Sequence, residues 1–374
     1  MFNSSLLFMF ILLPANILFC SIIVISTLLT LMANNVIIIW VGLELNLLAI
    51  IPLLINSYHI NESESAIKYF IIQAIGGILF LLGSLRIPLR EWSILYNEKL
   101  FRGFTNPIPP TIWEIYISKI PILLFLSGLL IKLGAAPFHF WFPQVISGIS
   151  WPICILITTW QKIPPLIIIS YLSKLGNYIY WIILIGLIGV IVGGIIGINQ
   201  TQLRPLLAYS SVAHIGWILL AINLATYIIL IYLSIYIIIS LAIIIVAYIN
   251  NQSAISIITP IKSFSYLTKL YIIILLFRYG GIPPLQGFLP KLIVSYSIVA
   301  HSIYILIVIT IIFSLIPLYY YFNLLFNCFI YPQYIPPTNQ IRFNLIITSF
   351  IFLGTFPLPI LVNLWINCAL TLLY

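Results

Sequence analysis

The stretch of residues 230–248, LIYLSIYIIISLAIIIVAY, decides the fold of this chain. It carries no charged residue, and its apolar residues run on continuously for about the 20 residues that a helix needs to cross a bilayer. A transmembrane β-barrel would instead need segments of about ten residues in which apolar and polar side chains alternate. The stretch therefore predicts an α-helix that spans a membrane.

The composition extends this prediction to the whole chain. Hydrophobic residues make up 63% of the 374 positions and charged residues 6%, and the mean hydropathy is +1.22. A soluble domain carries about a quarter charged residues, which keep its surface wetted. With so few charges, most of the surface must face lipid, so we expect an integral membrane protein.

Several function classes are disfavoured by the same composition. The net charge of +9 is scattered, whereas nucleic-acid binding needs a clustered basic patch. The sequence has no glycine fingerprint for a dinucleotide, no phosphate loop, and no cysteine spacing for a metal or an iron–sulfur centre. We therefore expect no cofactor, metal or redox centre on this chain. The cysteines read as small hydrophobic residues at Cys20, Cys154, Cys328 and Cys368.

Apolar runs separated by polar residues predict about eleven transmembrane helices in one all-α domain covering residues 1–374. Residues 86–113 hold the largest polar insertion and are expected to form an extramembrane loop. The expected spans are 6–31, 36–54, 65–85, 120–141, 151–171, 178–198, 206–224, 226–249, 270–299, 301–329 and 344–370.

Two of these spans contain Gly/Pro interruptions and are expected to be discontinuous. The first is broken at 134–137 (GAAP) and the second at 280–284 (GGIPP). A break at membrane depth leaves backbone groups unpaired and survives only where protein or a polar cavity satisfies them. Two breaks in corresponding halves indicate an internally repeated transporter fold. The alternative is that these prolines lie in ordinary loops at helix ends, and composition alone does not separate the two readings.

Charged residues within apolar runs favour the transporter reading. Insertion scales place the cost of a charge at a helix centre at about 2.5–3.5 kcal/mol. Glu44 and Lys162 lie near the middle of their segments, Lys132 directly precedes the first break, and Lys291 follows the second. Burial disfavours the charged form of a lysine and a nearby carboxylate restores it, so a lysine with a movable carboxylate partner is a switchable proton carrier. These four residues are therefore predicted to form a proton-translocation line.

Several charged residues and histidines can also be explained by a structural role. Lys132 and Lys291 could extend their ammonium groups to the membrane surface. His139 and His214 are possible relay groups, although a lone histidine is more often structural. Arg278, before the second break, is interpreted either as a charge within the membrane or as an anchor at a helix end, and the anchor is favoured. Basic residues divide almost evenly between the two sides, so the positive-inside rule does not decide the orientation.

Several long motifs resemble one family. They are WVGLELN at 40–46, ESAIKYF at 64–70, KLGAAPFHFW at 132–141, TWQK at 159–162, NQTQLR at 199–204, YSSVAHIGW at 209–217 and GGIPPLQGFLPK at 280–291. In this order they are similar to the chain 2 family of mitochondrial NADH:ubiquinone oxidoreductase, the antiporter-like membrane subunits of respiratory complex I. The match covers residues from about 36 to 295.

This resemblance implies an antiporter-like inverted-repeat fold and a proton-translocating role in the mitochondrial inner membrane, with the amino terminus in the matrix. It implies that Glu44 and Lys132 form a switchable pair, that Lys162 passes protons along a central axis, and that Lys291 communicates with the next site. FMN, iron–sulfur clusters and ubiquinone would lie on other subunits. Partners would be other membrane-arm subunits, including neighbouring antiporter-like chains, and lipids such as cardiolipin.

The chain departs from the family pattern at four places. The insertion at 86–113 is longer than in many animal relatives, Arg278 replaces a small or apolar residue, and Pro164 and Pro205 are unusual at their positions. None of these removes a key charge. Two other functions stay open: a stand-alone or Mrp-type cation/proton antiporter, and a scaffold that conducts nothing.

Overall fold

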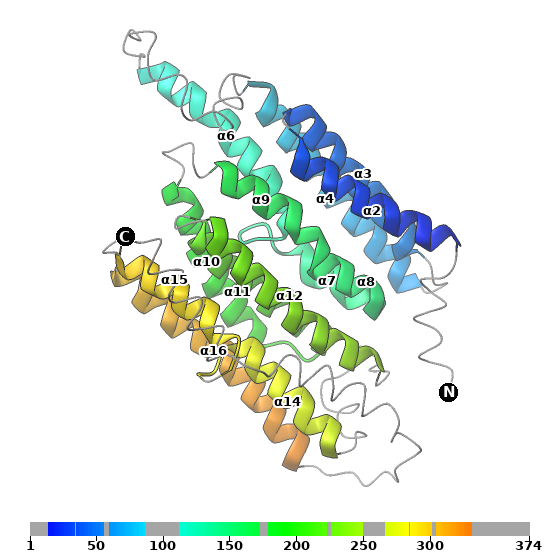
Figure 1. Ribbon diagram of the computed structural model, residues 1–374, viewed down its shortest axis with the longest axis vertical. Coiled ribbons are helices and arrows are strands. Elements are labelled where there is room, and N and C mark those ends of the chain that lie inside the picture. The colour runs from blue at the N-terminus through cyan, green and yellow to red at the C-terminus, as the bar shows by residue number, and fades with distance from the viewer. Residues whose placement is uncertain are drawn as a thin grey trace.

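The structure is a computed structural model that describes residues 14–33, 35–55, 60–86, 112–172, 179–222, 226–249, 266–283, 285–300 and 304–330. All regular secondary structure in these ranges is helical (Figure 1). The helices are α2 (Pro14–Met32), α3 (Val36–Leu54), α4 (Ile60–Arg86), α6 (Ile112–Leu133), α7 (Trp141–Gly148), α8 (Trp151–Thr158), the 3-10 turn η1 (Trp160–Lys162), α9 (Ile163–Leu172), α10 (Ile179–Ile198), α11 (Leu203–Ala221), α12 (Thr226–Ile249), α14 (Tyr266–Gly280), α15 (Phe288–Ala300) and α16 (Tyr304–Ile330).

Each predicted span that falls in the described ranges is helical, which confirms the all-α membrane fold. Eight helices are long and apolar enough to cross a membrane, and residues 120–133 and 288–299 form shorter apolar helices beside the two breaks. Helices α4 and α6 begin earlier than their apolar runs, at Ile60 and Ile112, because polar residues continue the helical hydrogen bonding outside the apolar stretch. The span 344–370 and the loop residues 87–111 lie outside the described residues.

The helices form an elongated bundle in which neighbours in sequence mostly pack side by side. In Figure 1, α2, α3 and α4 (blue) lie at one end, α14, α15 and α16 (yellow to orange) at the other, and α8 to α12 (green) between them. Many large apolar side chains face outward, such as Ile67 and Ile78 on α4, both 59% exposed. Outward apolar residues are what a lipid-facing surface requires.

Helices α10 and α11 approach closely because α10 presents a face of small residues. Its buried positions are mostly glycines, spaced three or four residues apart. A Cβ added at Gly186 would lie 2.9 Å from the Gly216 carbonyl oxygen of α11, so a larger side chain would force the two backbones apart. Without a hydrophobic drive between helices in lipid, such close packing holds membrane bundles together.

Both predicted breaks are present, and both begin with the same backbone motif. Gly134 ends α6 with φ +67° and Gly281 ends α14 with φ +82°, a left-handed region that favours glycine. The Ala135 N–H donates to the Leu130 carbonyl (3.0 Å), and the Ile282 N–H donates to the Phe277 carbonyl (3.3 Å). These are the bonds of a Schellman motif, which satisfies carbonyls that a helix end leaves free.

A third interruption lies where we expected a continuous helix, over residues 151–171. The α-helix gives way at Thr159 to the 3-10 turn η1, and α9 follows with Pro164 and Pro165 in its first turn. Neither proline can donate the α-helical hydrogen bond to Trp160 or Gln161, and the Trp160 carbonyl accepts from the Ile163 N–H of the 3-10 turn instead. Pro164 thus directly follows an irregular segment, whereas Pro205 sits in the first turn of α11, where proline is tolerated.

The interpretation of Arg278 as a helix-end anchor at the membrane surface is wrong. Arg278 lies in the last turn of α14 and is only 5% exposed. Helix α14 packs against α12 and α16, so this end of the helix is enclosed by the bundle instead of reaching the membrane surface.

Candidate functional site: a line of buried charges

Glu44 of α3 and Lys132 of α6 form an ion pair inside the bundle. The Lys132 Nζ donates to Glu44 Oε1 at 2.9 Å, and their side chains are 4% and 24% exposed. The ammonium is thus buried, while the carboxylate keeps partial contact with the surroundings. The alternative in which Lys132 extends to the membrane surface is excluded by this geometry.

Helix α4 lies between the two charged residues and shapes the site. A Cβ at Gly77 would overlap the Glu44 carboxylate, so only glycine leaves room for it there. The Gly77 carbonyl accepts a hydrogen bond from the Trp40 indole (3.1 Å), and the Gln73 amide donates to the Lys132 carbonyl (3.3 Å). The pair is therefore held by a helix that carries neither charge.

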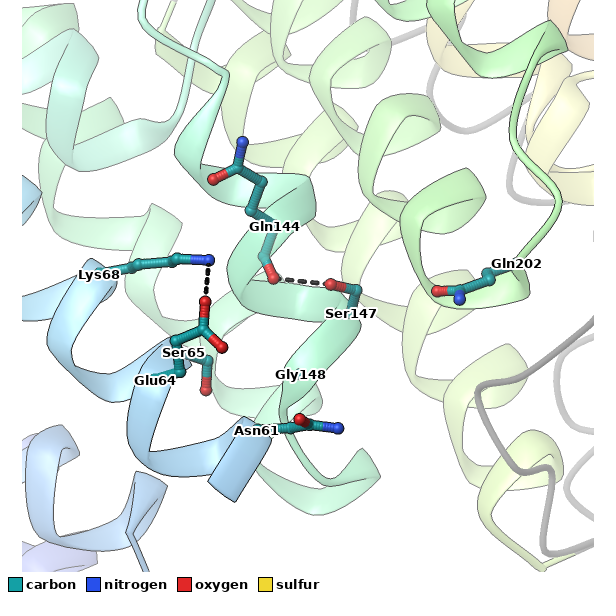
Figure 2. A pocket seen from close by; sticks show the side chains of 8 residues that line it. All are labelled: Asn61, Glu64, Ser65, Lys68, Gln144, Ser147, Gly148 and Gln202. Carbon is teal, nitrogen blue, oxygen red and sulfur yellow. Dashed lines mark hydrogen bonds and ion pairs between the residues drawn. The ribbon is translucent and has the colours of Figure 1, made fainter. Parts of the chain in front are cut away.

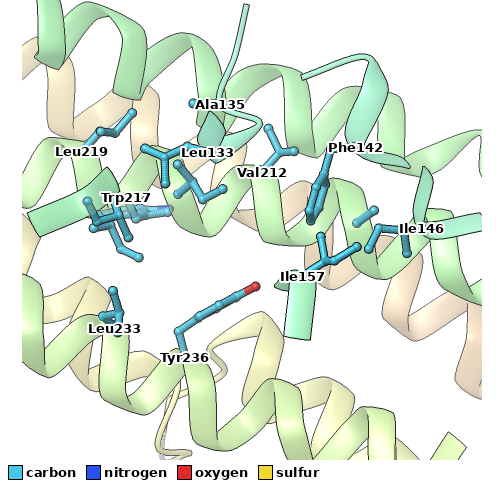
Figure 3. Close-up of a cluster of buried hydrophobic side chains, with 14 of the residues drawn as sticks. Leu133, Ala135, Phe142, Ile146, Ile157, Val212, Trp217, Leu219, Leu233 and Tyr236 are labelled. Carbon is cyan, nitrogen blue, oxygen red and sulfur yellow. The ribbon is translucent and has the colours of Figure 1, made fainter. Parts of the chain in front are cut away.

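Lys162 is buried in the centre of the bundle with a tyrosine as its partner. Its Nζ donates to the Tyr236 hydroxyl (2.8 Å), which in turn donates to the Thr158 carbonyl (3.0 Å). The ammonium also lies 4.9 Å from the centre of the Phe142 ring, a cation–π distance. Figure 3 shows the Tyr236 hydroxyl among apolar side chains. In the described part of the chain, no carboxylate lies within ion-pairing distance of Lys162.

The interruption in the helix explains this partner. In an α-helix the Thr158 carbonyl would accept from the Lys162 N–H, but this N–H lies in η1 and donates to the Thr159 carbonyl instead, at 3.4 Å. The Thr158 and Thr159 hydroxyls both donate to the preceding turn at 2.7 Å, which bends helices. Tyr236 thus satisfies a carbonyl that the break exposes and presents its hydroxyl oxygen to Lys162.

A hydrogen bond connects the region of the ion pair to that of Lys162. Asn46, two residues after Glu44, accepts from the Gln161 amide at 2.8 Å. Both residues neighbour a proposed charge carrier in sequence, so α3 and η1 are joined beside the site.

His214 and Lys291 bind consecutive carbonyls at the second break. The His214 Nε2 lies 3.1 Å from the Tyr279 carbonyl and the Lys291 Nζ donates to the Gly280 carbonyl at 2.6 Å. A carbonyl only accepts, so Nε2 carries the proton, and in neutral His214 the Nδ1 accepts from the Tyr232 hydroxyl (3.0 Å). Lys291 is 8% exposed and so does not reach the membrane surface.

A small cavity of about 10 Å³ joins these groups, roughly the space that one water needs. Its polar lining includes Ser210, His214, Tyr279, Lys291, Ser314 and Tyr321. The Tyr236 ring lies 5.5 Å from the His214 ring between centroids, so contacts run from Lys162 through Tyr236 and His214 to Lys291.

His139 is placed apart from this line. Its Nδ1 lies 3.2 Å from the Pro137 carbonyl inside the first break, and its ring contacts Phe140 and Tyr209. Its Nε2 is buried and has no hydrogen-bond partner among the described residues. These contacts do not connect it with Lys132 or Lys162.

The sequence identified the charged residues but not the tyrosines that pair with them. Tyr232 and Tyr236 lie four residues apart and so share one face of α12, where they bond His214 and Lys162. Hydroxyls repeated at helical spacing in the apolar run 230–248 were the available signal.

Comparisons with known proteins give one family. The model of the NADH:quinone oxidoreductase/Mrp antiporter transmembrane family matches residues 33–317. The chain is 35% identical over 291 residues to NADH-ubiquinone oxidoreductase chain 2 of Locusta migratoria, covering 78% of each protein.

Two solved structures share the fold. A chain of respiratory complex I from Thermus thermophilus matches with a TM-score of 0.69 at 23% identity, over 91% of this chain and 77% of that one. A chain of the Mrp complex from Dietzia matches with a TM-score of 0.69 at 16% identity, over 85% of this chain and 61% of that one.

Proposed function

This chain belongs to the NADH:quinone oxidoreductase/Mrp antiporter family, among its NADH-ubiquinone oxidoreductase chain 2 proteins, and we propose that Glu44, Lys132, Lys162 and Lys291 carry its protons. The chain is a proton-translocating membrane subunit of respiratory complex I. NADH oxidation and quinone reduction on other subunits supply the driving force.

The observation that carries the proposal is the buried ion pair. Lys132 is charged at little cost only while the Glu44 carboxylate lies 2.9 Å from it. Moving the carboxylate away, or protonating it, leaves the buried ammonium without compensation and favours release of a proton. Because the Glu44 side chain is 24% exposed, its carboxylate keeps a route to protonation that the Lys132 ammonium lacks.

Lys162 and Lys291 receive the proton next in this scheme. Neither has a carboxylate at ion-pairing distance in the described part of the chain, so each is easily returned to its neutral form. Tyr236 accepts a hydrogen bond from Lys162, its ring contacts that of His214, and His214 and Lys291 line the same small cavity. In this scheme a water in the cavity carries the proton between His214 and Lys291. His214 therefore belongs to the proposed relay, and His139 remains a possible relay group near the first break.

The surroundings of the chain are proposed from its relatives. The chain is a multi-pass membrane protein and a neighbour of other membrane-arm subunits. We place it in the mitochondrial inner membrane, beside neighbouring antiporter-like chains and lipids such as cardiolipin. FMN, iron–sulfur clusters and ubiquinone are assigned to other subunits, with no redox centre on this chain.

The test is the number of protons moved per electron by the intact complex in sealed vesicles. Lys132→Met and Lys162→Met each remove one proton carrier. In each variant the complex should still assemble, and the number of protons moved per electron should fall by the number that this chain contributes. Lys162→Arg keeps the charge but cannot release its proton, so it should behave like Lys162→Met. Normal ratios in assembled variants would refute the relay and favour a scaffold.

A stand-alone or Mrp-type antiporter is tested separately. The purified chain alone in vesicles would then exchange protons for sodium under an imposed sodium gradient. We expect no exchange, since the relatives at 35% identity are named as an oxidoreductase chain and the Mrp likeness is one of fold.

A further inference from the structure

A polar pocket opens at the bundle end where α4 begins, α7 ends and α11 begins. It has a volume of about 290 Å³, and its lining is polar apart from one glycine (Figure 2). The lining residues are Asn61, Glu64, Ser65, Lys68, Gln144, Ser147, Gly148 and Gln202. A polar hollow of this size admits water at the end of an otherwise apolar bundle.

A polar stripe along α4 begins at the lining residue Ser65 and continues with Tyr69, Gln73 and Gly77. These residues are four positions apart and so lie on one helix face. The first three side chains are 3%, 1% and 5% exposed, whereas Ile67, Phe70 and other apolar residues occupy the outward face. At 1.5 Å per residue, the stripe runs about 18 Å from the pocket into the bundle.

The stripe ends at the Glu44–Lys132 pair. Tyr69 lies two turns before Gly77 on the same face of α4, and its ring packs on Trp141 at 5.8 Å between centroids. Gln73 donates to the Lys132 carbonyl, and Gly77 faces the Glu44 carboxylate. The buried Tyr69 side chain thus lies along the stripe between the pocket residue Ser65 and the position that faces Glu44.

The other inner wall of the pocket carries a fixed positive charge. Arg204 Nη1 donates to the carbonyl of the lining residue Ser147 (3.4 Å), and its guanidinium lies 4.6 Å from the centre of a Trp151 ring. A cation in this position repels protons that would pass from the pocket straight to Lys162.

We propose that this pocket is the proton-uptake vestibule of the chain and that Tyr69 relays protons from it to Glu44, with Gln73 as a positioning residue. In one transfer the Tyr69 hydroxyl gives its proton to a water that passes one on to the Glu44 carboxylate, and the hydroxyl regains a proton from water on the pocket side, so the phenol is unchanged. Arg204 directs uptake to the ion pair. The proposal rests on the proposed function of that pair.

The first test removes only the relay hydroxyl. In the intact complex in sealed vesicles, Tyr69→Phe should reduce proton uptake through this chain about a hundredfold, the low end of what loss of one proton-transfer group costs. Tyr180→Phe is the matched control, because Tyr180 is 77% exposed and far from the pocket lining, and it should match the wild type. A wild-type ratio of protons to electrons in Tyr69→Phe would overturn the proposal.

Comparison with Lys132→Met separates this proposal from the proposed function. If Lys132→Met lowers the ratio and Tyr69→Phe does not, the relay of this section is wrong and the ion pair stands. If neither variant lowers the ratio of protons to electrons, both the proposed function and the proposed vestibule are wrong.

The second test blocks the pocket without touching α4, in case Tyr69→Phe fails to assemble. Gln144→Cys places a thiol in the lining, and Thr201→Cys places one at the same end of the bundle outside it. A membrane-impermeant, positively charged thiol reagent should lower pumping in Gln144→Cys only, and a reductant should restore it. An unreactive thiol at position 144, or labelling without effect, would overturn the vestibule.

Discussion

The two broken helices use the same backbone motif but compensate their lysines in different ways. Gly134 and Gly281 end α6 and α14 with left-handed turns and the same pair of hydrogen bonds. At the first break Lys132 precedes the glycine and pairs with a carboxylate from another helix. At the second break Lys291 follows it and binds the last carbonyl of the broken helix, that of Gly280.

This difference between the partners of Lys132 and Lys291 shows how a buried charge becomes switchable. A carboxylate supplies a full negative charge that can be moved or protonated, so the first lysine can be switched by its partner. The carboxyl end of α14 supplies only the partial charge of a helix terminus, which is fixed in place. The first break is therefore suited to receive a signal, and the second to accept and release protons under a constant field.

Among the variants that test this contrast between the two breaks, Glu44→Gln is expected to lower the stability of the complex most. It leaves the buried Lys132 ammonium without its carboxylate, and breaking a buried pair in this way costs about 3–5 kcal/mol. The yield of assembled complex and the midpoint of its heat-induced dissociation should both fall. A variant as stable as the wild type would mean that Lys132 is neutral in the resting state.

Lys291→Met is expected to be less destabilising than Glu44→Gln. It removes one hydrogen bond from a charged donor and leaves the Gly280 carbonyl unsatisfied, a loss of about 1–3 kcal/mol, but strands no opposite charge. The same dissociation midpoint measures it, and proton pumping should be lost nonetheless. The reverse order of stability would contradict the contrast drawn between the two breaks.

Alanine at either left-handed glycine tests whether the two motifs are equivalent. Gly134→Ala and Gly281→Ala should each cost about 1–2 kcal/mol, the strain of a left-handed residue with a side chain. The added Cβ atoms meet neighbours at the same distance, 3.1 Å, so the two losses in dissociation midpoint should be similar. Tolerance at one break only would show that its turn is not needed.

The smallest expected effect is that of Glu64→Gln, the surface counterpart of Glu44→Gln. Glu64 pairs with Lys68 at 2.6 Å along α4, but their side chains are 61% and 43% exposed. Water and salt screen such a pair, so no measurable change in the dissociation midpoint is expected, at low or high salt. A clear loss would mean that burial does not explain the effect at Glu44.

The sequence by itself determined the spans, the two breaks and the identity of the buried charges. All three features depend on local properties of the sequence: the length of an apolar run, the turn-forming residues Gly134 and Gly281, and the cost of placing a charge within an apolar run. The interruption at residues 159–162 was missed although Pro164 and Pro165 signalled it. The apolar residues on both sides of TWQK keep the mean hydropathy of residues 151–172 at 1.5, and hydropathy does not register backbone hydrogen bonds.

Only the tertiary structure decided which groups meet. Glu44 and Lys132 are 88 residues apart, Lys162 and Tyr236 are 74 apart, and His214 and Tyr279 are 65 apart. Such partners are set by how helices pack, which depends on small residues such as Gly77 and on the carbonyls freed at helix breaks. Hydropathy fixes which segments enter the membrane, but a charge acquires its function from the neighbour that packing brings to it.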